Sequence, residues 1–140
     1  GLKLTEVGAY ATDANQAYFL YATDDDLGAL TTNGNLHFVY SVGGTDYITN
    51  LGITVTANTV YRLRIAFDEN RKISVFVNNV QYGLVTTATA GGGTQSVSTT
   101  KSLAITDDID LLPFVGVQAL SAAGRGMQIG FIKMSRDLFE

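Results

Sequence analysis

The strongest constraint in this chain is a period of two in its apolar residues. From Val60 to Phe67 apolar positions alternate with polar or small ones, and the alternation returns from Ile73 to Asn78. A short polar stretch, 68–71, separates the two segments. A period of two places every second side chain on the same face of a β-strand, whereas a helix requires a period near 3.6. The pattern therefore predicts a β-hairpin.

The predicted hairpin has a definite register, because side chains alternate along both strands. The pairs expected on the core side are Phe67 with Ile73, Ile65 with Val75, and Leu63 with Val77. The pairs expected on the other side are Ala66 with Ser74, Arg64 with Phe76, and Arg62 with Asn78. Cross-strand neighbours are close, so we expect the Arg64 guanidinium to lie over the Phe76 ring.

Further segments favour strands because they alternate or form short apolar runs rich in β-branched and aromatic residues. The expected strands are 2–7, 17–22, 35–42, 45–50, 80–85, 114–120 and 127–135. Within 127–135 the core-facing side is ambiguous, because apolar residues occupy both parities. The segment 86–102, rich in Thr, Gly, Ala and Ser, is expected to be a long flexible loop or arm. We therefore expect one all-β domain over 1–140, an antiparallel two-sheet β-sandwich.

The composition excludes several kinds of site. The chain has no Cys, so disulfides, thiolate metal sites and cysteine nucleophiles are ruled out, and His37 is the only imidazole. A net charge of -4 argues against nucleic acid as a partner. No membrane or targeting segment is visible. Because the chain begins with Gly1 rather than Met, we expect it to be processed, tagged or truncated, and upstream material can be missing.

The order of several segments is more informative than any one of them. These segments are 17–24, 34–38, 51–55, 61–68 running into 73–79, 111–118 and 127–136. Two recurring motifs are a strand, acidic turn and strand ending in Val77-Asn78, and the pattern L-x-P-x-x-x-x-Q over 111–118. Together they resemble the concanavalin A-like, or laminin G-type, jelly-roll family. The resemblance is greatest to the versions in virion proteins of tailed bacteriophages, and it covers about 17–136.

This resemblance implies two packed antiparallel sheets in a jelly roll. It also implies a structural role in a phage virion, as a capsid decoration protein or a module of a tail appendage. Neighbouring virion proteins would then be the partners, and the chain would form a homo-oligomer such as a trimer. The alternative function is a carbohydrate-binding, lectin-like module of a tail appendage or cell-surface protein.

The carboxylates do not resemble a glycosidase site. In the glycoside hydrolases of this superfamily, the catalytic site resembles the motif E-x-D-x-E on one strand. This motif sets two carboxyl groups about 5 Å apart. The nearest segment here, 107–110, contains no Glu, and the three Glu of the chain are Glu6, Glu69 and Glu140. His37 has no nearby partner of the kind that catalysis or metal binding needs. We therefore expect no enzymatic activity, no catalytic residue and no cofactor.

Two acidic clusters are candidates for calcium, which binds carboxylate and carbonyl oxygens. They consist of Asp24, Asp25 and Asp26, and of Asp107, Asp108 and Asp110. Neither has the twelve-residue calcium-loop pattern, and solvated acidic turns, in which Asp caps local backbone N–H groups, are the favoured interpretation of both clusters.

The candidate partner interface consists of Arg62, Arg64 and Phe76, which share the side of the hairpin facing away from the core. Arg and aromatic residues are enriched at interface centres. An ordinary exposed sheet face is the alternative interpretation. Glycan stacking would instead use Tyr10, Tyr47 or Tyr82, since the chain has no Trp.

Overall fold

The structure, a computed structural model, describes residues 1–3, 13–23, 30, 32–89, 92–94, 96–107, 111–113, 115 and 128–135. This described part of the chain is all-β and contains no helix. Its strands are β1 (Leu2–Lys3), β2 (Gln16–Tyr21), β3 (Asn35–Val42), β4 (Thr45–Thr54), β5 (Leu63–Phe67), β6 (Ile73–Val77), β7 (Val80–Tyr82), β8 (Gly93–Thr94) and β9 (Leu112–Pro113).

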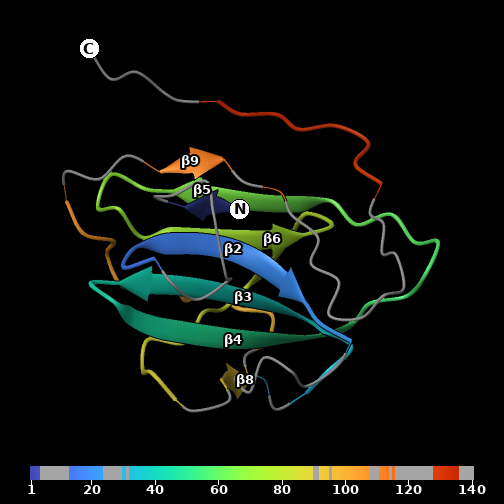
Figure 1. Cartoon of the computed structure of the whole chain (residues 1–140), viewed down its shortest axis with the longest axis horizontal. Helices are drawn as coiled ribbons and strands as arrows, with labels where there is room; N and C mark the ends of the chain where they lie inside the picture. The colour runs from blue at the N-terminus through green and yellow to red at the C-terminus, as the bar shows by residue number, and fades with distance from the viewer. Residues whose placement is uncertain are drawn as a thin grey trace.

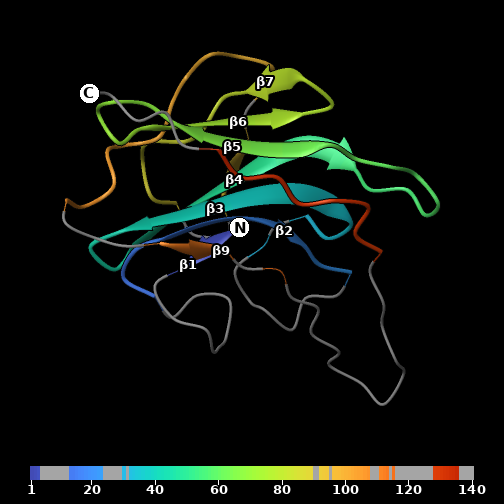
Figure 2. The ribbon, with the colours of Figure 1, turned by 90° about the horizontal axis from the view of Figure 1, so that it is seen from above.

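The strands form two sheets, neither of which closes into a barrel. The large sheet has the order β8-β4-β3-β2-β1-β9, and the small sheet has the order β5-β6-β7. Neighbouring strands are antiparallel, except that β8 runs parallel to β4. Figure 1 shows the large sheet from β9 down to β8, and Figure 2 shows the two sheets as separate layers. The arrangement is compatible with the expected β-sandwich.

The main core lies between the two sheets. Its largest fully buried side chains are Phe38 and Tyr40 of β3, Ile73 and Val75 of β6, and Leu84 after β7. These side chains project from one face of each strand, as the period of two requires. Burial of such side chains from both sheets is the main source of the fold's stability.

The hairpin prediction is confirmed at every pair of the two strands. The register runs from Leu63 opposite Val77 to Phe67 opposite Ile73, with Arg64 opposite Phe76. A polar turn joins the strands, and Arg71 adopts a positive φ of 60° within it. The β6–β7 turn uses Asn78 and Asn79, also at positive φ, a conformation that Asn tolerates and that two-residue hairpin turns require.

The predicted burial of Leu63 and Phe67 in the core is wrong. Their side chains are 45% and 42% exposed, whereas their partners Val77 and Ile73 are 3% and 0% exposed. The reason is topological, because among the described residues β5 is the outermost strand of the small sheet and has a neighbour, β6, on one side only.

The other strand predictions have mixed outcomes. Strands 17–22 and 35–42 are confirmed as β2 and β3, and 45–50 is confirmed but extends to Thr54. Of 80–85 only Val80–Tyr82 is a strand, and of 2–7 the structure describes only β1. The segment 114–120 lies outside the described residues except for Val115, which is not in a strand.

The predicted strand 127–135 is wrong over 128–135, which the structure describes without strand pairing. Its apolar side chains stay exposed, so no packing fixes one face inward. The predicted loop 86–102 is irregular over most of its described residues. It contributes β8, a bridge from Val97 to Tyr82, and a main-chain hydrogen bond from the Ser102 N–H to the Ile73 carbonyl. No helix in the described chain is long and apolar enough to span a membrane.

Candidate functional site

The candidate site is the face of the small sheet that points away from the core. Arg64 of β5 and Phe76 of β6 are direct cross-strand partners on this face. The guanidinium carbon of Arg64 lies 3.6 Å from the centroid of the Phe76 ring. This is the cation–π contact that the hairpin register predicts, since side chains opposite each other in an antiparallel pair are close neighbours.

Phe76 sits in the middle of a row of three side chains that crosses the small sheet. Arg64 flanks it on β5 and Gln81 flanks it on β7. The ring is half-buried, Gln81 is half-buried and Arg64 is exposed. The row thus presents an aromatic surface, a fixed cation and an amide to solvent, a combination typical of interface centres.

Arg62 extends this surface toward the end of the hairpin. Its main-chain N–H donates to the Asn78 side-chain oxygen (2.9 Å), and its carbonyl accepts from the Asn78 N–H (2.9 Å). These bonds fix the backbone at Arg62 and leave its side chain exposed. Within the described residues, neither Arg62 nor Arg64 forms an ion pair with a carboxylate. Both positive charges are therefore available to a partner, on a chain whose net charge is -4.

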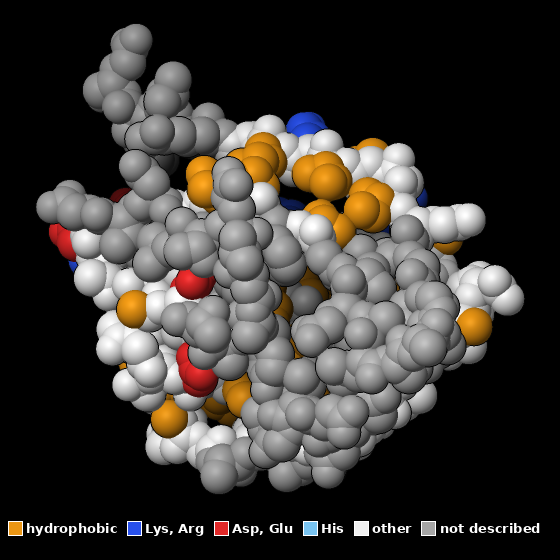
Figure 3. All heavy atoms as spheres, in the orientation of Figure 1, with side chains coloured by type: hydrophobic (Ala, Val, Ile, Leu, Met, Phe, Trp, Pro, Cys, Tyr) orange, Lys and Arg blue, Asp and Glu red, His pale blue; other side chains and the backbone are white. Residues whose placement is uncertain are grey.

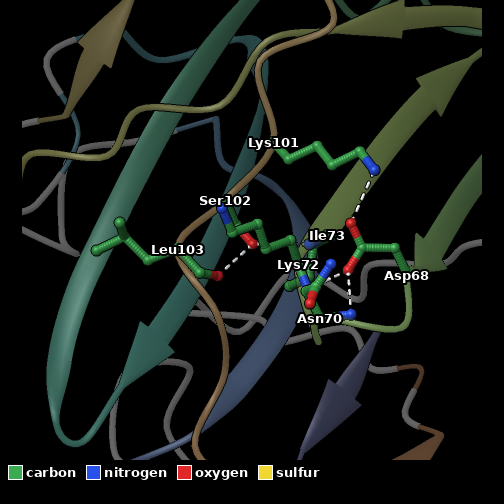
Figure 4. Close-up of polar contacts among 7 residues, drawn as sticks. All are labelled: Asp68, Asn70, Lys72, Ile73, Lys101, Ser102 and Leu103. Atoms are coloured by element: carbon green, nitrogen blue, oxygen red, sulfur yellow. Dashed lines mark hydrogen bonds and ion pairs between the residues drawn. The ribbon is translucent and has the colours of Figure 1, made fainter.

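The opposite end of the hairpin is anchored by Asp68, as Figure 4 shows. Its carboxylate accepts hydrogen bonds from the Asn70 N–H and the Lys72 N–H, both at 2.9 Å. Lys101 Nζ lies 2.7 Å from the other carboxylate oxygen. The hydrogen bond with Lys101, together with those from the two N–H groups, lowers the pKa of Asp68. The cluster fixes the turn and ties the end of the 86–102 segment to it.

Ser102 continues this attachment into the sheet. Its hydroxyl accepts from the Ile73 N–H (2.8 Å) and donates to the Leu103 carbonyl (2.6 Å), also drawn in Figure 4. Ala104 then forms an antiparallel bridge with Lys72. The segment therefore takes the place beside the start of β6 that β7 is too short to fill.

The two acidic clusters proposed for calcium fall almost entirely outside the described residues. Asp24, Asp25, Asp26, Asp108 and Asp110 lie outside the described residues. Asp107 is exposed, and one of its oxygens lies 3.3 Å from the Arg71 guanidinium. No group of three His, Cys, Asp or Glu within the described residues could hold a metal ion.

His37 lies buried on the far face of the large sheet. Its Nδ1 is 3.0 Å from the Asn35 carbonyl, so the neutral ring donates from Nδ1, and Nε2 has no hydrogen-bond partner. Burial lowers the pKa of His37, partly offset by the bond to Asn35. Within the described chain, no Ser hydroxyl or carboxylate forms a hydrogen bond with this ring.

Two of the tyrosines proposed for glycan stacking, Tyr47 and Tyr82, lie in the described part of the chain and pack against other side chains of the fold. Tyr47 stacks on the buried Tyr40 ring, with centroids 4.8 Å apart and an interplanar angle of 9°. Tyr82 packs against the main core, and Tyr10 lies outside the described residues. The described members of the set contribute to the fold and leave little ring surface for a sugar.

Sequence reasoning missed a second core on the far face of the large sheet. Tyr18, Val39 and Ile48 are buried there, and Gln16 Nε2 donates to the Ser41 hydroxyl (2.9 Å), which in turn donates to Asp46. A signal was present, because β2 and β3 carry apolar residues at both parities. Strands of that kind are buried on both faces.

Comparison with known proteins adds no relative to this picture: no family model, curated protein or solved structure matches the chain. The concanavalin A-like resemblance thus rests on the quoted segments, and the chemistry of the site must be argued from the residues themselves.

Proposed function

We propose that this chain is a non-enzymatic structural protein of a bacteriophage virion, a capsid decoration protein built on a concanavalin A-like jelly roll. The face formed by Arg62, Arg64 and Phe76, here called the arginine–aromatic face, would bind a neighbouring coat or appendage protein. Buried interface area would then cement the particle against internal pressure.

The observation that carries this proposal is the position of Arg64 over Phe76 on the outside of the small sheet. A half-buried ring under an exposed guanidinium contributes little to the core. A partner that covers the pair desolvates the cation–π contact and gains ring area, both of which strengthen association. Arg62 and Arg64 add positive charge that suits an acidic partner surface.

Two further features support a structural role. The strands of both sheets hold the face on a rigid support, which is what a lattice contact needs. The described tyrosines of the glycan alternative are occupied in the core. The carbohydrate-binding alternative therefore becomes an outcome of the test rather than a second proposal.

The test uses capsids assembled from the coat protein encoded in the same genome, with this chain left out. Purified chain is co-sedimented with them over a range of concentrations. The Arg64→Ser/Phe76→Ser double variant should bind at least about tenfold more weakly while keeping its circular dichroism and melting profile.

Glu69→Ser is the control, because Glu69 is an exposed charged residue of the turn and lies outside both strands that carry the arginine–aromatic face. It should bind like the wild type. Equal binding of the double variant and the wild type would show that the arginine–aromatic face is not the interface. Failure of the wild type to bind any such capsid, together with binding to a glycan array, would reject the virion role in favour of recognition.

A further inference from the structure

A second surface of interest is the edge of β5 that faces away from β6. In the described structure β5 pairs with β6 only, and its other edge has no strand beside it. Leu63 and Phe67 point toward the core from this strand and yet remain nearly half exposed. An open strand edge with apolar side chains beside it is a template for an added strand.

The chain also carries an unpaired apolar segment of suitable length. Residues 128–135 contain four large exposed apolar side chains, those of Ile129, Phe131, Ile132 and Met134. The eight residues would span about 26 Å as a strand, more than the five residues of β5 need. The segment contains no Pro, so every residue can donate to a ladder of main-chain hydrogen bonds.

The segment and the edge lie on the same side of the molecule. In Figure 1 the segment, in red, passes above β5 and β9, the outermost strands of their sheets, and Figure 2 places it between the two layers. Figure 3 shows apolar side chains gathered along this side. The segment nevertheless forms no strand pairing there, and Phe131 is 77% exposed.

The parity of the apolar residues favours a second copy as the acceptor. In a strand, Ile129 and Phe131 would face one way, and Ile132 and Met134 the other. A strand added to β5 of its own chain would bury one of these sides and leave the other exposed. A strand lying between two molecules is covered on both sides, and strands of that kind are apolar at both parities.

We propose that residues 128–135 bind as an added strand along the free edge of β5 in a second copy of this chain. Exchange of the segment in both directions gives a closed two-fold dimer. This contact uses the edge of β5, whereas the arginine–aromatic face uses its outer side, so either proposal can fail while the other holds.

The experiment measures sedimentation and amide hydrogen exchange of the full chain from micromolar to millimolar concentration. A dimer should form as the concentration rises, and amides of 63–67 and 128–135 should gain protection together. Phe131→Asp should weaken dimerisation at least about tenfold, since it places a charge in an apolar contact. Phe131→Leu should retain the dimer.

Val97→Asp is the matched control, because it also replaces an exposed apolar side chain with Asp. Val97 is 63% exposed and bridges to β7, on the opposite edge of the small sheet from β5. It should dimerise within about twofold of the wild type. A monomer at every concentration would overturn the proposal. So would protection of the two segments that does not depend on concentration, or a dimer that Phe131→Asp leaves intact.

Discussion

Arg64 and Phe76 lie on neighbouring strands, opposite each other, with the guanidinium carbon 3.6 Å from the ring centroid. An exposed cation–π contact of this kind contributes only about 0.5–1 kcal/mol. The hairpin is already held by its ladder and by the burial of Ile73, Val75 and Val77. We therefore expect the pair to contribute little to the stability of the fold.

Removing the cation should accordingly leave the fold nearly unchanged. We expect Arg64→Ser to lower the free energy of unfolding by at most about 1 kcal/mol, measured by urea denaturation. Arg62→Ser is the control, since Arg62 lies beside Asn78 rather than over the ring. A loss above about 2 kcal/mol for Arg64→Ser alone would make the pair a structural element.

Tyr40 links the large sheet to the segments that follow the small sheet. Its hydroxyl donates to the Val85 carbonyl (2.6 Å) and accepts from the Leu103 N–H (3.3 Å). Tyr40→Phe leaves both groups without this partner in the core, so we expect a loss of about 1–3 kcal/mol. Thermal and urea unfolding check this. A variant as stable as the wild type would show that water replaces the hydroxyl.

The same burial gives Tyr40 a distinct response to alkali. Burial, which outweighs the hydrogen bond from Leu103, raises the pKa of Tyr40 to about 12. Since a free tyrosine ionises near 10, the unfolded chain loses this proton first, and stability falls as the pH rises from about 10 to about 12. An ultraviolet titration of the folded protein should show a phenol that ionises near pH 12 in the wild type and is missing in Tyr40→Phe.

His37 should make the protein sensitive to mild acid. Its pKa is lowered by burial, so the unfolded chain binds a proton near pH 6.5 before the folded chain does. The contribution of His37 to stability is therefore present above about pH 6.5 and is lost as the pH falls below it. In His37→Gln the decline in unfolding free energy between pH 7 and pH 5 should be shallower. Parallel curves for the two proteins would contradict this.

Of the two acidic residues in the hairpin turn, Asp68 and Glu69, only Asp68 should contribute to the stability of the fold. Asp68→Ala removes the acceptor of two main-chain N–H groups and of Lys101, and should cost about 1–2 kcal/mol. Glu69→Ala, the neighbouring exposed residue, should change stability by less than about 0.5 kcal/mol. Because the pKa of Asp68 is lowered, its contribution is present above about pH 4 and is lost as the pH falls further. Equal melting temperatures for the two variants at pH 7 would reject the anchoring role.

The hairpin could be predicted residue by residue because its signal is local. Strict alternation on both sides of a short polar turn leaves one register that puts Ile73 and Val75 on the buried side, and that register also places Arg64 over Phe76. The contact of Lys101 with Asp68 joins distant parts of the chain, and no local sequence pattern at either residue predicts it.

The wrong predictions concern segments whose structure depends on distant parts of the chain. The exposure of Leu63 depends on whether another strand lies beside β5, which the alternation within β5 does not encode. The segment 128–135 has apolar residues at both parities, so its pattern is consistent with a buried strand while its neighbours are undetermined. The acidic clusters were placed by composition, and five of their six residues lie outside the described chain.

The most direct test of the proposed virion role is an electron cryomicroscopy reconstruction of a phage particle produced by a genome that encodes the chain. The account predicts density for this β-sandwich on the particle, with Arg64 and Phe76 turned toward a neighbouring protein. The account would be contradicted by a particle that lacks the chain, or by one in which the arginine–aromatic face points into solvent and another face makes the contact.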